Sequence, residues 1–300
     1  MTLGSAVIAL LSGSAPLYIG VCAVLGLLVG SFLNVVIHRV PLMLDRQWRR
    51  QCLELDGKAA PDETPFNLIA PRSACPACKA PITALQNIPV LSYLLLRGRC
   101  AGCGKPIGLR YPLVEALTGI ASALVAWRFG FGWAAGAGLV LTWFLVALTF
   151  IDVDTQLLPD NLTLPLLWLG LLASLLLPGA PGETLPVDLR SSVIGAIAGY
   201  MSLWSVYQAF RLLTGKEGMG YGDFKLLAAL GAWLGWQMLL PIVLAAAAVG
   251  ALVGIALIAL RRKDRSVPMA FGPFLAAAGY FMLLFGHDLV ERYLALYGPR

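Results

Sequence analysis

Two groups of acidic residues lie at the ends of strongly apolar segments. The first group is within the sequence IDVDTQLLPD and contains Asp152, Asp154 and Asp160. The second is Asp223, which directly follows a Gly-x-Gly sequence. A carboxylate at membrane depth is costly, so an acidic residue beside an apolar helix is a functional candidate by default.

Asp152 and Asp223 are the two strongest candidates for chemistry. Each abuts an apolar segment, and the glycines before Asp223 permit close approach of the backbone. Two carboxylates brought together share a proton, because both cannot ionise cheaply. One of them can then deprotonate water while the other protonates a carbonyl oxygen or a leaving amine. This is the chemistry of an aspartic peptidase.

The other acidic residues also have structural interpretations. Asp160 follows a proline and precedes an apolar run, as a helix N-cap does. Asp154 is either functional or a solvated charge at the membrane surface. Glu115, near the start of another apolar segment, either pairs with Arg110 or lies at the membrane interface.

Four of the six cysteines form two matched Cys-x-x-Cys pairs. Residues 79–99 separate the pair Cys75 and Cys78 from the pair Cys100 and Cys103. Four thiolates at about this spacing can surround one zinc ion as a tetrahedron, and a site filled by four cysteines is structural rather than catalytic. The alternatives are two redox disulfides or unrelated thiols, and a cytoplasmic location disfavours structural disulfides.

The composition excludes a soluble globular enzyme, a disordered chain and a secreted disulfide scaffold. Of the 300 residues, 59% are hydrophobic and 13% are charged, and the mean hydropathy is +0.79. Soluble domains are about 45–50% apolar and about 25% charged. The sequence therefore predicts an all-α polytopic membrane protein embedded in a lipid bilayer.

Eight apolar segments approach the roughly 20 residues that a membrane helix needs. The sixth is short and has charged residues at its start, so it is the least secure. The expected membrane helices lie near residues 15–38, 112–128, 131–151, 161–178, 191–212, 223–237, 238–260 and 267–287. Residues 39–111, between the first two helices, are expected to form a small zinc-binding loop domain.

The distribution of basic residues predicts the orientation. Half of the 22 lysines and arginines lie between Arg39 and Arg110. Basic residues gather on the cytoplasmic side of membrane proteins, so this segment is expected in the cytoplasm and the N-terminus outside. The net charge of +6 then reflects topology rather than a nucleic-acid partner. Alternation of the helices places Asp152 and Asp223 on the cytoplasmic side.

Other catalytic systems have little support. The only two histidines, His38 and His287, are expected on opposite sides of the membrane, which excludes a histidine-based triad or an HExxH zinc site. No GxSxG nucleophile elbow and no phosphate-binding GxxxxGK[ST] loop is present.

The combined motifs resemble the GxGD aspartic peptidases, and within them the bacterial type IV prepilin peptidases. The resemblance rests on Gly-x-Gly-Asp-x-Lys at 220–225, on Ile-Asp-x-Asp-x-x-Leu-Leu-Pro-Asp at 151–160 and on the paired Cys-x-x-Cys sequences. It continues through GSFLNVVIHRVP at 30–41, NIPVLSY at 87–93 and RYPLVE at 110–115. These motifs occur in order and cover nearly the whole chain.

The resemblance implies that Asp152 and Asp223 are the catalytic dyad of a membrane peptidase domain spanning residues 112–300. Its substrates would be type IV prepilins and type II secretion pseudopilins, cut after a glycine at the cytoplasmic face of the inner membrane. The zinc loop of residues 39–111 is typical of bifunctional members, which methylate the new N-terminus with S-adenosylmethionine. No methyl-donor site is recognisable in the sequence. Pilus or secretion assembly components are further possible partners.

Three other functions remain open at this point. The chain would be a peptidase alone if the cysteine loop is only structural or a docking surface. A transporter could use Asp152, Asp154 and Asp223 as a proton or cation path, but this does not explain the zinc loop. A scaffold whose loop docks an assembly factor leaves the Gly-x-Gly-Asp sequence unexplained.

Overall fold

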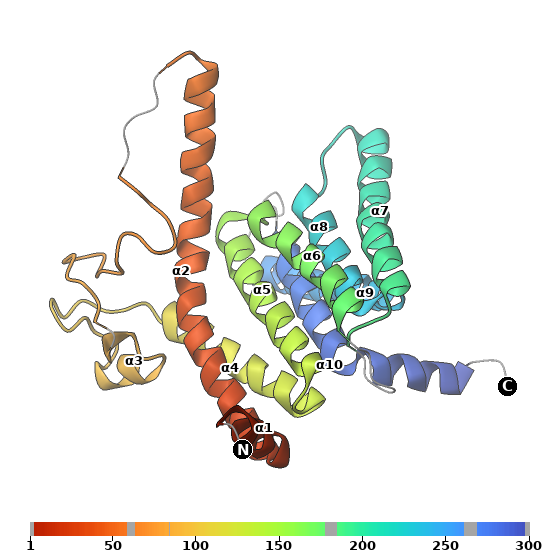
Figure 1. Cartoon of the computed structure of the whole chain (residues 1–300). Coiled ribbons are helices and arrows are strands. Elements are labelled where there is room, and N and C mark those ends of the chain that lie inside the picture. The colour runs from red at the N-terminus through yellow and green to blue at the C-terminus, as the bar shows by residue number, and fades with distance from the viewer. Residues whose placement is uncertain (1–2, 59–63, 84, 178–184, 261–268, 298–300) are drawn as a thin grey trace. The chain divides into compact units, whose positions relative to one another are not determined.

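The computed structural model describes residues 3–58, 64–83, 85–177, 185–260 and 269–297, and these are mainly helical, with the exception of the cysteine region (Figure 1). Within these ranges the strand-like pairings are isolated bridges in the cysteine region. The all-α prediction is confirmed. The α-helices are α1 (Leu3–Gly13), α2 (Ala15–Leu55), α3 (Leu91–Leu95), α4 (Arg110–Phe129), α5 (Trp133–Thr155), α6 (Asp160–Leu176), α7 (Leu189–Thr214), α8 (Tyr221–Leu234), α9 (Leu239–Ala259) and α10 (Gly272–Tyr297). Two short 3-10 helices are η1 (Leu85–Asn87) and η2 (Trp236–Met238).

The chain divides into two compact units. The N-terminal unit is Met1–Ala123 and the C-terminal unit is Leu124–Arg300, so the division falls within α4. The N-terminal unit contains the four paired cysteines. The C-terminal unit contains both candidate catalytic aspartates.

The number of spans differs from the expected eight. Six of the described helices are long and apolar enough to cross a membrane, and the chain is a multi-pass membrane protein. The fourth and sixth expected spans are α6, with 17 residues, and α8, with 14 residues. At about 1.5 Å per residue, α8 covers only about 21 Å of a hydrocarbon core of about 30 Å. It ends at Leu234 because Gly235 turns the chain with a φ of 81°.

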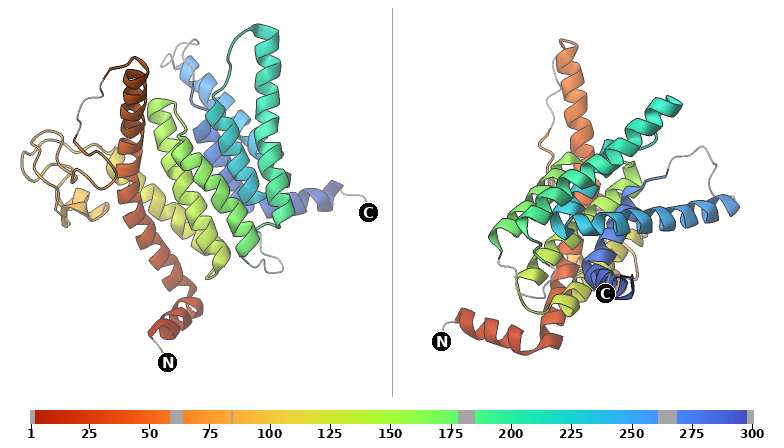
Figure 2. Two further views of the ribbon diagram at one scale, coloured as in Figure 1. Left: turned by 45° about the horizontal axis from the view of Figure 1, so that its top comes forward. Right: turned by 90° about the vertical axis from the view of Figure 1, so that its right-hand side faces the viewer.

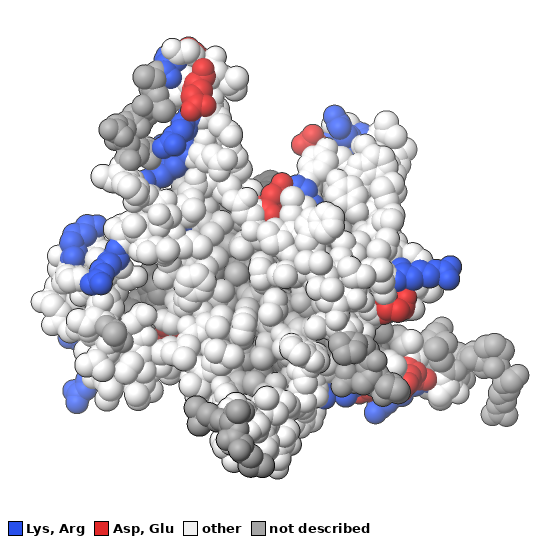
Figure 3. Space-filling model, viewed as in Figure 1, with Lys and Arg blue, Asp and Glu red and all other residues white. Residues whose placement is uncertain are grey.

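Helix α2 is much longer than the membrane segment expected at 15–38. It runs for 41 residues and continues through Pro41 to Leu55. Its charged last third is held in part by an ion pair one turn apart, in which Arg49 Nε lies 3.0 Å from Asp45 Oδ2. The first part of the expected loop domain, residues 39–55, is therefore helical. Figure 3 shows blue and red side chains gathered over the upper, C-terminal part of α2.

Helix α8 is the buried centre of the C-terminal unit. It packs against α6, α7 and α10, and α6, α7 and α8 run side by side in Figure 1 and in the left-hand view of Figure 2. Glycines permit this packing, since a Cβ on Gly199 would lie 2.6 Å from the Leu227 carbonyl oxygen, and Gly195 meets the Gly231 backbone. On the α6 side, Trp233 Nε1 donates to the Leu166 carbonyl oxygen at 2.8 Å. Small residues let membrane helices approach closely, so the sequence of α7 and α8 specifies a tight pair.

Candidate functional site

Asp152 is buried near the C-terminal end of α5. Its backbone carbonyl accepts the Gln156 N–H at 2.9 Å, and Gln156 ends the helix in a left-handed conformation. The residue Asp152 is only 4% exposed; its Oδ2 makes no hydrogen bond of good geometry with the described residues, and the backbone N–H of Gly272 is the polar group that faces the carboxylate. A buried carboxylate oxygen without a partner is costly in a purely structural role, so its burial points to chemistry.

Asp223 lies in the first turn of α8. Gly220 is the N-cap, and the Asp223 carboxylate reaches back to the Gly220 backbone N–H, which resembles a capping box. The residue is 8% exposed. Gly222 beside it has a structural reason, since a Cβ there would lie 2.6 Å from Leu158 Cβ. The two acidic motifs therefore touch through Gly222 and Leu158.

The two carboxylates also interact with each other. Both side chains are buried, and Asp223 lies close enough to Asp152 to be affected by its charge. A third element completes the surroundings, because a Cβ on Gly272, at the start of α10, would lie 2.5 Å from Asp152 Oδ2. Two close buried carboxylates hold a shared proton more readily than two charges, which is the arrangement that acid–base hydrolysis needs.

Asp160 does not have the role expected of it. It is the first residue of α6 rather than its N-cap, because Pro159 occupies the cap position and gives no side-chain cap. The Asp160 Oδ1 instead lies 2.6 Å from Lys225 Nζ, which joins the start of α6 to the first turn of α8. Asp154 is exposed.

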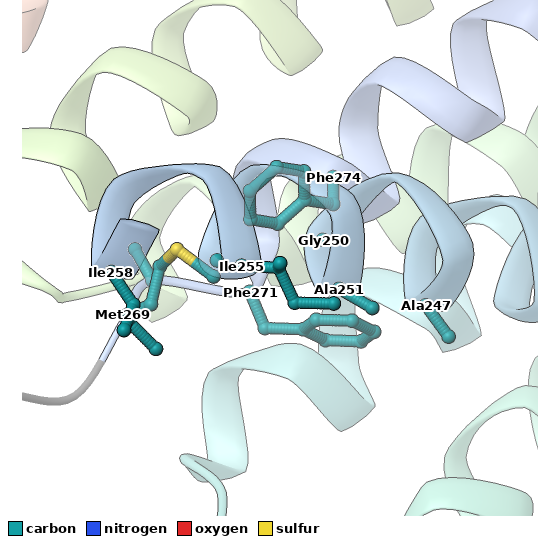
Figure 4. A pocket seen from close by; sticks show the side chains of 10 residues that line it. Ala247, Gly250, Ala251, Ile255, Ile258, Met269, Phe271 and Phe274 are labelled. Atoms are coloured by element: carbon teal, nitrogen blue, oxygen red, sulfur yellow. The ribbon is translucent and has the colours of Figure 1, made fainter. Parts of the chain in front are cut away.

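An apolar groove of about 470 Å³ lies between α9 and the start of α10 (Figure 4). Gly250 and Gly254 of α9 line the groove, together with Met269, Phe271 and Phe274. The groove contains no titratable side chain, so it has no reacting group of its own. It lies next to Gly272, the residue that faces Asp152.

The four paired cysteines converge on one point in the N-terminal unit. Their sulfur atoms all lie within 4.8 Å of one another, with 3.9 Å between Cys75 and Cys103 and 4.0 Å between Cys78 and Cys100. A tetrahedron with Zn–S bonds of about 2.3 Å has sulfur–sulfur edges of about 3.8 Å. The cluster could therefore hold a metal ion, and its donor set and dimensions fit zinc.

The two cysteine pairs are copies of one local fold. Cys75 N–H donates to the Ala80 carbonyl and Cys100 N–H to the Lys105 carbonyl, each at 2.9 Å. The residue after each second cysteine has a positive φ, 60° at Lys79 and 70° at Gly104. In the first copy, backbone N–H groups of Cys78 and Ala77 point at the Cys75 sulfur and lower the pKa of its thiol to about 6. The thiolate, which is the metal-binding form, is thus favoured at Cys75, whereas burial and hydrogen bonds with the neighbouring thiols raise the pKa of Cys103 to about 11.

A segment before the cysteines is fastened to α2 by a buried arginine. Arg39 donates from Nη1 to the Asn67 carbonyl at 2.8 Å and from Nη2 to the Pro71 carbonyl at 2.6 Å. Its guanidinium also lies 5.7 Å from the centre of the Phe66 ring. Arg39 can therefore be buried among the apolar residues of α2, because backbone carbonyls satisfy its guanidinium.

Glu115 has a role that sequence reasoning missed. It is 9% exposed, and its Oε2 accepts the backbone N–H of Val90 at 2.8 Å rather than lying at an interface. Val90 has a φ of 59°, a strained value for a β-branched residue that costs about 1–3 kcal/mol. A hydrogen bond contributes about 0.5–1.5 kcal/mol net, so the bond from Val90 N–H to Glu115 offsets part of that strain. No signal in the sequence pairs these two residues.

Sequence reasoning also missed the role of Gly272, although a Gly-Pro sequence is a recognisable signal for the start of a helix. Proline is favoured in the first turn of a helix, and a preceding glycine allows close approach of another group. The contact with Asp152, however, depends on tertiary packing.

Comparisons with known proteins assign both units. The bacterial peptidase A24 N-terminal domain matches residues 24–129, and the type IV leader peptidase family matches residues 139–255. No solved structure matches the chain.

Curated relatives are similar over nearly the whole length. A prepilin leader peptidase/N-methyltransferase of Aeromonas hydrophila is 57% identical over 281 residues, covering 93% of this chain and 94% of the relative. Proteins of the same name from Pseudomonas aeruginosa and Neisseria gonorrhoeae are 50% and 51% identical, covering 95% and 91% of this chain and 97% and 92% of theirs. The resemblance noted in the motifs is confirmed, and the chain belongs to the type IV leader peptidase family.

Proposed function

We propose that this chain is a bifunctional membrane enzyme. It cleaves the basic leader of type IV prepilins and type II secretion pseudopilins after a glycine, and it then methylates the new N-terminal amine. The observation that supports the proposal is the contact between Leu158 and Gly222, which brings together the two distant segments that carry the buried Asp152 and Asp223. The names of the relatives support both activities.

Asp152 and Asp223 are the proposed catalytic dyad. One carboxylate accepts a proton from the attacking water, and its partner donates a proton to the carbonyl oxygen of the scissile bond. The unpartnered Asp152 Oδ2 is the atom that has hydrogen-bonding capacity to spare. Gly272 leaves space for that oxygen, and Gly222 lets the start of α8 approach the segment that joins α5 to α6.

The N-terminal unit is the proposed site of methyl transfer. All the residues assigned to cleavage lie in the C-terminal unit, whereas the N-terminal unit carries the cysteine cluster that the resemblance links to bifunctional members. The residues that would hold zinc are Cys75, Cys78, Cys100 and Cys103, which would fix the fold of residues 64–109. S-Adenosylmethionine supplies the methyl group when it is bound.

The proposed location is the bacterial inner membrane, with residues 39–111 and the dyad on the cytoplasmic side. Basic residues between Arg39 and Arg110 support this orientation by the positive-inside rule. A second basic run at residues 261–265, RRKDR, is also expected on the cytoplasmic side and lies outside the described residues. A prepilin with its apolar helix in the membrane would then present its leader on the side where Asp152 and Asp223 lie.

The deciding experiment is incubation of the purified enzyme with a prepilin, with and without S-adenosylmethionine, followed by intact-mass analysis. We expect loss of the leader in both samples and one added methyl group only with the donor. Asp152→Asn and Asp223→Asn should each abolish cleavage. Asp154→Asn is the matched control, because it makes the same change two residues away on an exposed side chain.

Each outcome distinguishes between functions. Cleavage by either dyad variant at the wild-type rate rejects the assigned residues. Leader loss without methylation would leave a peptidase alone. Absence of cleavage by well-folded wild-type protein would reject the peptidase and favour an ion-transporting role for the buried acids.

A further inference from the structure

We infer that Glu115 is a positioning residue for methyl transfer and that it acts by holding a strained turn at Val90. The inference rests on the proposed two activities. Residues 89–91 form a γ-turn, since Leu91 N–H donates to the Pro89 carbonyl across Val90, whose φ is 59° and ψ is −49°. This form of γ-turn is rare and strained, and strained backbone persists only where its surroundings hold it.

Glu115 is the group that holds the turn. In a γ-turn the N–H of the central residue points away from the turn, and here Val90 N–H is taken by Glu115 Oε2 at 2.8 Å. The same carboxylate is hydrogen-bonded by the side chain of Ser31 on α2. Helices α2 and α4 approach closely at this level, since a Cβ on Gly30 would lie 2.8 Å from Glu115 Cα. One carboxylate therefore connects α2, α4 and the loop.

The turn sets the course of the chain toward the metal-binding cysteines. Leu91 begins α3 directly after the turn, and the chain then folds back so that Gly98 N–H donates to the Tyr93 carbonyl at 2.9 Å. Cys100 follows two residues later. A change in the backbone conformation at Val90 would therefore move α3, and through this short, hydrogen-bonded segment it would also move the cysteine cluster. The proposed dyad residues have no part in this connection.

Methyl transfer is sensitive to such an error, because an in-line displacement needs its reacting atoms aligned, and a misplacement of about 1 Å can cost about 100-fold. Leader cleavage does not depend on the turn and therefore serves as an internal control. We expect Glu115→Ala to lower the fraction of cleaved product that is methylated by at least about tenfold, with cleavage within about twofold of the wild type.

Two further substitutions test positioning against a direct chemical role. Glu115→Gln keeps an oxygen that accepts the Val90 N–H and should retain most methylation. Val90→Gly combined with Glu115→Ala should restore methylation in part, because glycine adopts a positive φ without strain. Val90→Pro keeps Glu115 but removes the N–H and fixes φ near −65°, so it should reproduce the loss.

The measurement is intact-mass analysis of the prepilin product over time with saturating S-adenosylmethionine. A wild-type methylated fraction in Glu115→Ala or in Val90→Pro overturns the inference. So does a Glu115→Gln variant as defective as Glu115→Ala, since that result assigns the carboxylate itself to the reaction. If Glu115→Ala fails to fold and loses cleavage too, the test rests on the other two variants. The inference then requires that Glu115→Gln methylates its product and that Val90→Pro does not. Failure of the wild type to methylate refutes the proposed second activity instead.

Discussion

The two glycines of the Gly-x-Gly-Asp sequence should respond very differently to an added methyl group. A Cβ on Gly222 would lie 2.6 Å from Leu158 Cβ, whereas ordinary contacts begin at 3.4 Å. Leu158 is 8% exposed in the segment that joins α5 to α6, so it has little freedom to yield. A Cβ on Gly220 would meet nothing within 4 Å, and Gly220 has an ordinary extended backbone with φ −80°.

The magnitude follows from this geometry. Gly222→Ala must separate the start of α8 from Leu158 by at least about 0.8 Å to restore a 3.4 Å contact. Such a shift moves Asp223 relative to Asp152, and a misplacement of about 1 Å costs about 100-fold in rate. Overpacking also costs about 1–3 kcal/mol of stability. Gly220→Ala changes only the N-cap residue of α8, which is worth about 1 kcal/mol or less, and cleavage should stay within about threefold.

Initial rates of leader removal by the two purified variants, at several prepilin concentrations, provide the test. For Gly222→Ala we expect the loss mainly in kcat, because the dyad is displaced while the substrate-binding surface is unchanged. A thermal unfolding midpoint for each variant separates displacement from general instability. The reasoning fails if Gly222→Ala cleaves within threefold of the wild type, or if Gly220→Ala is equally impaired.

Two other predictions concern the metal site and the ion pair. Reduced, native protein should contain about one zinc per chain by metal analysis. Cys75→Ser should lose most of the zinc, while Cys52→Ser, a change at an exposed cysteine on α2, should keep it. A zinc content near zero in the wild type would contradict the site. Asp160→Ala should retain most turnover, since a partly exposed ion pair is worth about 0–1 kcal/mol. A loss as deep as that expected for Asp223→Asn would show instead that the Lys225 contact is essential to the reaction.

Much of the fold could be predicted from apolar runs, because a membrane helix is specified mainly by length and hydropathy. The lengths of α2 and α8 could not be predicted in this way. Helix α2 continues past the apolar stretch because its charged residues form a helical surface with an i,i+4 ion pair. Helix α8 stops early because Gly235 adopts a positive φ, a property that composition does not specify.

The candidate dyad could be proposed from residue type and context alone, since acids beside apolar helices are rare and conspicuous. Its surroundings could not. The role of Gly272 depends on where α10 begins relative to α5, and that of Glu115 on a backbone conformation at Val90. Asp160 shows the same limit, because its local sequence is typical of a cap while its partner is Lys225, far along the chain.

The shortness of α8 suits it to hold a catalytic carboxylate. From Asp223 to Leu234 every residue except Lys225 is buried, so the helix is enclosed rather than exposed to lipid. Close backbone packing against α7 at Gly195 and Gly231 fixes the position of its axis. A side chain on a rigid, enclosed helix keeps its geometry better than one on a loop. Gly235 makes α8 too short to span a membrane, while Gly231 and Gly222 allow its close contacts with α7 and with Leu158. These glycines therefore hold Asp223 close to the segment that carries Asp152.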